Sequence, residues 1–105
     1  MLLKYVHDPE SLSEGHAEHG KKGEDIVCAA ISTLFYTLGE CLYESRAMLD
    51  GDFIFDNDNG KGHIWCRPKK EFEGNIARTY LTVMIGFDMV AKNYEKNVKL
   101  VILGG

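Results

Sequence analysis

The chain has 105 residues, of which 45% are hydrophobic and 27% are charged, as in an ordinary soluble globular protein. This length allows one domain with a modest core. Sixteen acidic residues outnumber twelve basic ones and give a net charge of −4, which argues against a nucleic-acid-binding protein, in which a basic patch is expected. The sequence contains no apolar run near the roughly 20 residues that cross a bilayer.

Cysteine usage and the first residues bear on location. Three cysteines, an odd number, do not form a complete disulfide framework, and this favours a reducing compartment. Residues 1–3 are apolar, but Lys4 interrupts the apolar segment and polar residues follow from His7, unlike a signal peptide. We expect a cytoplasmic protein.

The first part of the chain predicts one or two short strands. Residues 1–6 have strand composition, and Asp8-Pro9 ends this segment because proline cannot donate to a sheet. Leu12 is a candidate for a short second strand that runs into Gly15. Residues 17–24 are polar and contain two glycines, which predicts a loop, either a mobile one or a solvent-exposed connector.

A long helix is predicted from residue 26 to about residue 47. Its apolar residues recur at steps of three and four and form one stripe: Val27, Ile31, Leu34, Leu38, Cys41 and Leu42. Asp25 is a good N-cap residue, which places Cys28 at the third helical position. Cys28 is then about 100° around the helix from Val27, on the flank of the stripe with Ser32 and Phe35, where we expect partial exposure.

Residues 52–67 predict a β-hairpin, because two strand-like segments flank the turn-rich residues 57–60 and their Asn-Gly pair is a strong hairpin signal. We expect Phe53 and Trp65 to pack against the helices. Cys66 alternates with Trp65 and is expected on the other face of the sheet.

A second helix is predicted from about residue 71 to residue 94, and residues 98–103 form a final strand. The helix carries an apolar stripe made of Phe72, Ile76, Tyr80, Val83, Phe87, Val90 and Tyr94. The predicted fold class is α+β, a small, mainly antiparallel sheet packed with two long helices in the order β(β)-α-β-β-α-β, in a single domain over residues 1–105. We expect Cys41 in the core and His63 at the surface.

The segment that ends in Cys28 carries the candidate chemistry. A cysteine in the first turn of a helix lies near a partial positive charge, which favours the nucleophilic thiolate. The unpaired N–H groups of a helix start can also stabilise an oxyanion. His16, twelve residues upstream, can fold back as the general base. Ser32 lies one turn after Cys28, so its hydroxyl can bond within the site.

The string from Gly15 to Ser32, GHA-x5-G-x-DIVCAA-I-S, closely resembles the signature of the Prp family, the bacterial ribosomal-processing cysteine proteases. The resemblance implies a small α+β protein that forms homodimers and removes a short N-terminal extension from large-subunit ribosomal protein number twenty-seven of the L series. It assigns Cys28 as the nucleophile and His16 as its base, with neither a cofactor nor a metal. The supporting site residues are Asp25, Ser32, Gly15 and Gly23.

A loop between base and nucleophile that opens and closes would admit a peptide. The predicted substrate loop consists of Ala17, Glu18, His19, Gly20, Lys21 and Lys22. Family members usually have two strands before the GHA motif, whereas fourteen residues precede Gly15 here. The N-terminal hairpin is therefore expected to be short or partly missing.

Two alternatives stay open. The shortened N-terminus is compatible with a catalytically silent homologue that binds a peptide, and the substrate of an active enzyme could be a phage structural protein with a similar cleavage sequence. A metal site is weaker: His16 and His19 have H-x-x-H spacing, but they lie in a glycine-rich segment and the chain has no CxxC pair. The further ligands of such a metal site would be Cys28, Cys66 and His63.

Overall fold

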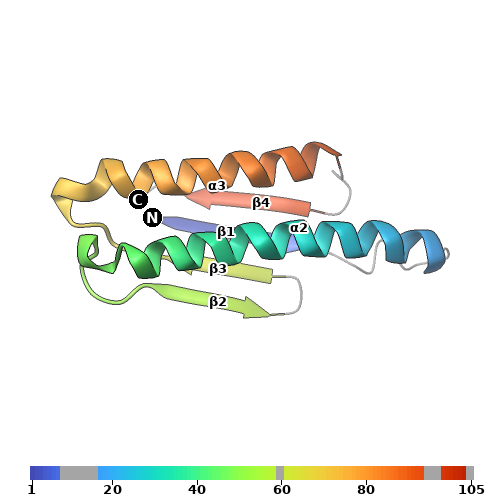
Figure 1. Cartoon of the computed structure of the whole chain (residues 1–105), viewed down its shortest axis with the longest axis horizontal. Helices are drawn as coiled ribbons and strands as arrows, with labels where there is room; N and C mark the ends of the chain where they lie inside the picture. Colours follow the sequence, from blue (N-terminus) through green and yellow to red (C-terminus); the bar gives the residue numbers. More distant parts are fainter. Residues whose placement is uncertain (8–16, 59–60, 94–97, 104–105) are drawn as a thin grey trace.

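The computed structural model describes the backbone of residues 1–7, 17–58, 61–93 and 98–103, and the side chains of residues 1–5, 26–58 and 61–93. Four strands and two long helices follow one another (Figure 1): β1 (Leu2–His7), α2 (Ala17–Glu44), β2 (Ile54–Asp58), β3 (Lys61–Trp65), α3 (Glu73–Asn93) and β4 (Val98–Leu103). Short 3-10 helices, Arg46–Met48 and Lys70–Phe72, follow α2 and precede α3. The α+β class and the order of elements are confirmed, while the predicted second strand near Leu12 lies outside the described residues.

The four strands form one antiparallel sheet in the order β2-β3-β1-β4. The predicted hairpin is confirmed, since β2 and β3 pair on either side of residues 59–60. Both helices cover the same face of the sheet, because Tyr5 of β1 packs against Phe35 of α2 and Phe87 of α3, with ring centroids 5.1 and 5.7 Å apart. We call this face the inner face and the opposite one the outer face.

The core lies between the inner face and the two helices. The predicted stripe of α2 is buried at four of its six positions, Val27, Ile31, Leu38 and Leu42, whereas Leu34 and Cys41 are half-buried. Phe35, predicted on the exposed flank, is completely buried. In the stripe of α3 the buried residues are Ile76, Tyr80, Val83 and Phe87.

Residues Ile26–Glu44 of α2 are long and apolar enough to cross a membrane, by length and composition alone. The expectation that no apolar segment approaches this length is therefore wrong. Their apolar stripe, however, packs into the core between the sheet and α3. A helix that buries one face and exposes the other is the core helix of a globular fold, and we interpret α2 in this way.

The start of α2 differs from the prediction. The helix begins at Ala17, nine residues before the predicted start at residue 26, so the predicted loop over residues 17–24 is wrong and Asp25 is not the N-cap. Alanine, glutamate and lysine favour helices, whereas Gly20 and Gly23 each cost about 1 kcal/mol relative to alanine without ending the helix. The result is a continuous helix whose first turns are its weakest part.

The predicted faces of Trp65 and Cys66 are also wrong. Cys66 is completely buried in the core, and the Tyr80 hydroxyl donates to its sulfur over 3.4 Å. Trp65 pairs across the sheet with Leu2 and Ile54 on the outer face. Because side chains alternate between the two faces along a strand, an error of one residue in choosing the buried set places every side chain on the wrong face of the sheet. Phe53, in contrast, packs against the core as predicted.

The contact between Tyr80 and Cys66 predicts a loss of stability at alkaline pH. Burial raises the pKa of the Tyr80 hydroxyl, and burial likewise raises the pKa of the Cys66 thiol. Both groups are therefore neutral in the folded protein. Their contribution to folding stability is complete below their ordinary pKa values, 10.0 for Tyr80 and 9.0 for Cys66. This contribution is lost as the pH rises through the folded-state pKa values. Above those ordinary values, the free energy of unfolding should fall by up to about 1.4 kcal/mol per pH unit for each group.

Urea unfolding between pH 8 and pH 11 measures this decline. The Tyr80→Phe variant lacks one of the two groups, so its stability should fall less steeply above pH 10. An equally steep decline in the variant would show that Tyr80 does not contribute.

Candidate active site

Cys28 is the twelfth residue of α2 rather than the third. Its side chain is half-buried on the flank of the buried stripe, as predicted. Inside a helix, however, backbone N–H groups bond to carbonyls four residues earlier, and the partial charge of the helix start acts only over the first turn. In this conformation the helix start neither activates the Cys28 thiol nor offers N–H groups for an oxyanion there.

The other predicted site residues fall into two groups. Ser32 is half-buried one turn after Cys28. The predicted substrate loop, with Gly23 and Asp25, forms the first turns of α2, and the side chains there lie outside the described part. Gly15 and His16 are also outside the described residues, so the pairing of His16 with Cys28 stays a prediction.

The structure adds a chain of polar side chains that the sequence did not predict. The Tyr5 hydroxyl donates to Asn57 Oδ1 over 3.2 Å, and Asn57 Nδ2 donates to the Tyr36 hydroxyl over 3.3 Å. This polar chain (Tyr5, Asn57 and Tyr36) links β1, β2 and α2. Burial, followed by the charges of Tyr36 and Cys28, raises the pKa of Tyr5. The hydroxyl of Tyr5 therefore stays protonated within electrostatic range of Cys28.

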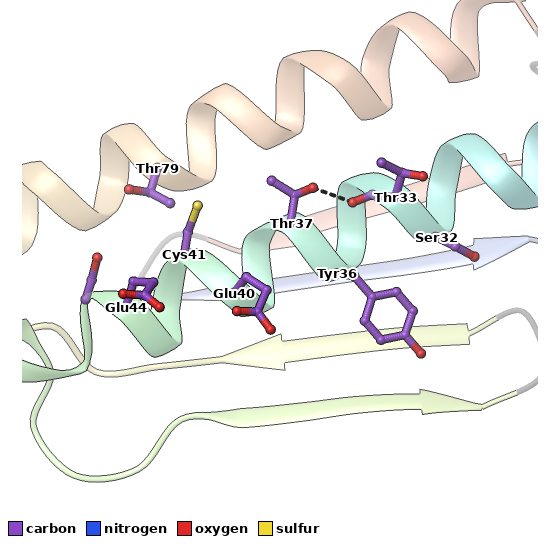
Figure 2. Close-up of a pocket in the computed structure, with 9 residues that line it drawn as sticks. Ser32, Thr33, Tyr36, Thr37, Glu40, Cys41, Glu44 and Thr79 are labelled. Carbon is purple, nitrogen blue, oxygen red and sulfur yellow. Dashed lines mark hydrogen bonds between the residues drawn. The ribbon is translucent and has the colours of Figure 1, made fainter.

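The position of Tyr36 relative to Cys28 could have been predicted from the sequence. Cys28, Ser32 and Tyr36 follow one another at steps of four, so they lie along one side of α2. Figure 2 shows Ser32 and Tyr36 on α2, with the Tyr36 ring directed toward the strands. Tyr5 and Asn57, in contrast, meet only through the pairing of three strands, which no local pattern reveals.

Gly62 allows the polar chain to form. Tyr5, Gly62 and Asn57 occupy one row across β1, β3 and β2, so the Tyr5 ring crosses over Gly62 to reach Asn57. A Cβ at Gly62 would lie 2.0 Å from the Tyr5 ring and 2.7 Å from the Phe35 ring. The absence of a side chain at this position therefore makes room for both aromatic rings.

Gly62→Ala should destabilise the protein by about 1–3 kcal/mol, because both rings must move in a packed core. The measurement is the free energy of unfolding in urea. Gly74→Ala is the matched control, since a Cβ at Gly74 in α3 meets no atom within 4 Å. Equal stability of the two variants would contradict the tight packing at Gly62.

Two hollows lie along α2. The larger, of about 700 Å³, has α2 and α3 as its walls, and Figure 2 shows Thr33, Thr37 and Cys41 directed toward α3. It is lined by Ser32, Thr33, Tyr36, Thr37, Glu40, Cys41, Glu44, Ser45 and Thr79. The smaller, of about 290 Å³, lies toward β2 and is lined by Tyr36, Gly39, Glu40, Tyr43, Phe53 and Phe55.

The positions of the candidate metal ligands argue against the metal site considered above. Within the described part of the chain, no three His, Cys, Asp or Glu side chains gather as a metal site. Cys66 is in the core, whereas His63 is half-exposed in an outer-face row with Lys4 and Asp56. These two candidate ligands therefore face opposite sides of the sheet and do not share a site.

Comparisons with known proteins agree on one family. The sequence model of the family described as "Cysteine protease Prp" matches residues 10–99. Two curated relatives, from the Mu50 and NCTC 8325 strains of Staphylococcus aureus, are named "Ribosomal processing cysteine protease Prp". Each is 28% identical over 89 residues, which cover 85% of this chain and 81% of the relative. No solved structure matches this chain. Because the match covers most of its length, the chain belongs to the Prp family of cysteine proteases.

Proposed function

We propose that this chain is a cysteine endopeptidase that removes a short N-terminal extension from a bacterial large-subunit ribosomal protein. Cys28 attacks the scissile carbonyl, and His16 takes the thiol proton and returns it to the leaving amine. The observation that carries the proposal is the half-buried Cys28 on the flank of α2, beside Ser32 and within electrostatic range of Tyr5. The family match and the names of the Staphylococcus aureus relatives support the same activity.

The dyad requires a rearrangement at the start of α2. Ala17 lies eleven residues before Cys28 in the same helix, about 16 Å along its axis. A general base must come within about 3 Å of the proton that it takes. We therefore propose that the first turns of α2, up to Glu24, unwind when substrate binds, and that the predicted substrate loop forms from them.

Unwinding would also activate the thiol. A helix shortened to begin after Asp25 has Asp25 as its N-cap and Cys28 in its first turn. The partial positive charge and the unpaired N–H groups of the new helix start then lie beside the thiol. The predicted mechanism would thus operate in the substrate-bound conformation, and Gly23 would be the hinge.

The proposed enzyme acts in the cytoplasm as a homodimer. Its reaction needs no cofactor, and neither nucleic acid nor a membrane is among its proposed partners. A net charge of −4 suits a cationic substrate, such as the lysine-rich start of a ribosomal protein. A phage structural protein with a similar cleavage sequence is the alternative substrate.

The direct test is incubation with a peptide that spans the start of the ribosomal protein, followed by mass spectrometry. A single cut that releases the extension is the expected result. A peptide from a phage structural protein, run in parallel, tests the alternative substrate. Recovery of the intact ribosomal peptide would contradict the proposed activity.

A catalytically silent, peptide-binding homologue is the second candidate, because in the described conformation Cys28 lies inside a helix. Alkylation at neutral pH with a peptide chloromethyl ketone, which carries the residues that precede the proposed cleavage site, separates the two candidates, because binding of its peptide part induces the unwinding that activates the thiol. Fast labelling of Cys28 relative to Cys41, which is also half-buried on α2, indicates an activated thiol. Equal, slow labelling of both cysteines favours the silent homologue.

A further inference from the structure

Tyr36 lies between the two hollows, because it lines both of them. It has 52% of its surface accessible, so a bound molecule can reach its hydroxyl. Cys28 and Tyr36 lie on the same side of α2, eight residues apart. Side chains of a helix lean toward its N-terminus, which brings the Tyr36 hydroxyl back toward Cys28. A peptide that is bound at Cys28 and continues along α2 therefore passes Tyr36.

Two contacts hold the Tyr36 side chain in place. Its ring packs on Phe55 of β2, with the ring centroids 5.3 Å apart, and Phe55 lies directly on the helix at Gly39, where a Cβ would be 2.6 Å from the Phe55 ring. Asn57 Nδ2 donates to the Tyr36 hydroxyl oxygen over 3.3 Å. The hydroxyl is therefore held in position before any ligand binds, which lowers the entropic cost of a contact with a ligand.

The polar chain has a direction, which follows from its donors. Tyr5 gives its hydroxyl proton to Asn57 Oδ1, so the amide nitrogen of Asn57 is the donor toward Tyr36. A hydroxyl carries one proton and two acceptor lone pairs, and Tyr36 keeps its own proton for another acceptor. Among the described residues no acceptor takes this proton. Tyr36 is thus the donor end of the polar chain, and the bond that it accepts from Asn57 strengthens it as a donor.

The surroundings of Tyr36 select a neutral acceptor. Glu40 lies one turn after Tyr36 and also lines both hollows, and it makes no ion pair within the described part of the chain. Its negative charge repels a carboxylate or a phosphate from this place. A peptide, in contrast, offers one neutral carbonyl per residue, and each carbonyl is an obligatory acceptor. The main chain of a bound peptide therefore supplies the acceptor that fits.

We propose that the Tyr36 hydroxyl donates a hydrogen bond to a main-chain carbonyl of the substrate peptide, and that Tyr5 and Asn57 are positioning residues that orient this donor. Tyr36 lies eight residues after Cys28, about 12 Å along the helix axis, and an extended peptide advances about 3.3 Å per residue. Because the ring leans back toward Cys28, the accepting carbonyl lies two to four residues from the scissile bond. The inference rests on the proposed function, since Cys28 defines the scissile position.

Tyr36→Phe removes the donor and keeps the ring. The KM for the ribosomal peptide should rise about three- to tenfold, as expected for the loss of one hydrogen bond. The kcat should stay within about twofold, because the contact is the same in the ground state and in the transition state. Tyr43→Phe is the matched control, since Tyr43 is also 52% accessible on α2 but lies outside the polar chain, and its KM should not change. An unchanged KM in Tyr36→Phe overturns the proposal.

A thioamide scan gives a readout that a merely structural role of Tyr36 would not move. One peptide carbonyl at a time is replaced by a thiocarbonyl, which is a weaker acceptor. In the wild type, one position two to four residues from the scissile bond should show a larger rise in KM than its neighbours. In Tyr36→Phe this position should lose its excess, because the donor is absent. The same pattern of losses in both proteins overturns the proposal.

Asn57→Asp tests the positioning role, because it reverses the direction of the polar chain. A carboxylate accepts and does not donate, so it accepts from both tyrosines and turns the Tyr36 proton away from the peptide. The KM should rise about as much as in Tyr36→Phe, and the variant with both substitutions should be no worse than either single variant. Multiplied losses in the double variant would show that the added charge acts independently of Tyr36, which overturns the role of Asn57.

A binding experiment separates this inference from the proposed function. The Cys28→Ala variant, mixed with fluorescently labelled peptides of the thioamide scan, should show the same single position in its Kd by anisotropy. Detection of this position without cleavage by the wild type overturns the protease but leaves the Tyr36 contact. Cleavage without any position that depends on Tyr36 overturns the contact but leaves the protease. A peptide that does not bind at all overturns the contact.

Discussion

Cys28→Ala should lower kcat/KM for the ribosomal peptide by at least about 10⁴-fold. In cysteine and serine proteases the nucleophile forms the covalent bond to the substrate, and removal of such a group leaves only the rate that binding and electrostatics supply. The measurement is a time course of cleavage by mass spectrometry with equal amounts of folded wild type and variant.

The fold should tolerate this change. Cys28 is half-buried at the edge of the core rather than within it, and alanine is the strongest helix former. We expect the free energy of unfolding to change by less than about 1 kcal/mol. Loss of activity in Cys28→Ala would therefore report on chemistry rather than on folding.

Cys41→Ala is the matched control, because Cys41 is also a half-buried cysteine of α2. It lines the larger hollow toward α3 and plays no part in the proposed reaction. We expect its kcat/KM to stay within about twofold of the wild type. Undiminished cleavage by Cys28→Ala would end the assignment of Cys28 as the nucleophile, and equal losses in both variants would point to a structural effect on α2.

The fold was largely predictable because its signals are local and repeated. The stripes of the two helices recur over several turns, and the Asn-Gly pair marks the hairpin between β2 and β3. The sheet faces were not predictable in the same way. Trp65 is the larger side chain and was expected in the core, but the row of Gly62, Ile64 and Cys66 occupies the inner face. Strand period alone does not decide which of two alternate sets is buried.

The site was predictable only in part, because two starts of α2 are compatible with the sequence. Asp25 is a suitable cap for a short helix, while Ala17 and the lysines before Gly23 favour a longer one. The two glycines cost about 2 kcal/mol, which is small enough for added helical hydrogen bonds to offset. Local patterns therefore located Cys28 and Ser32 on one helix flank but not the conformation of the segment before them.

Gly20→Ala combined with Gly23→Ala should lower kcat/KM by up to about 30-fold. Each substitution favours the helical form of the first turns of α2 by about 1 kcal/mol, and a conformational cost of about 2 kcal/mol corresponds to this factor. If the first turns must unwind before His16 reaches Cys28, the active conformation becomes rarer by the same factor. Circular dichroism should show equal or higher helix content in the double variant.

Two further variants distinguish unwinding from a steric effect of the new methyl groups. Gly74→Ala stabilises the helical conformation of α3 rather than that of the start of α2, and its Cβ meets no atom within 4 Å. This variant should leave kcat/KM unchanged. Lys21→Gly, introduced into the double-alanine variant, weakens the same turns by about 0.7 kcal/mol and should restore activity about threefold. A steric clash would not be relieved by this third change. Wild-type activity in the double-alanine variant would show that α2 does not need to unwind, and the dyad between His16 and Cys28 would then lose its physical basis.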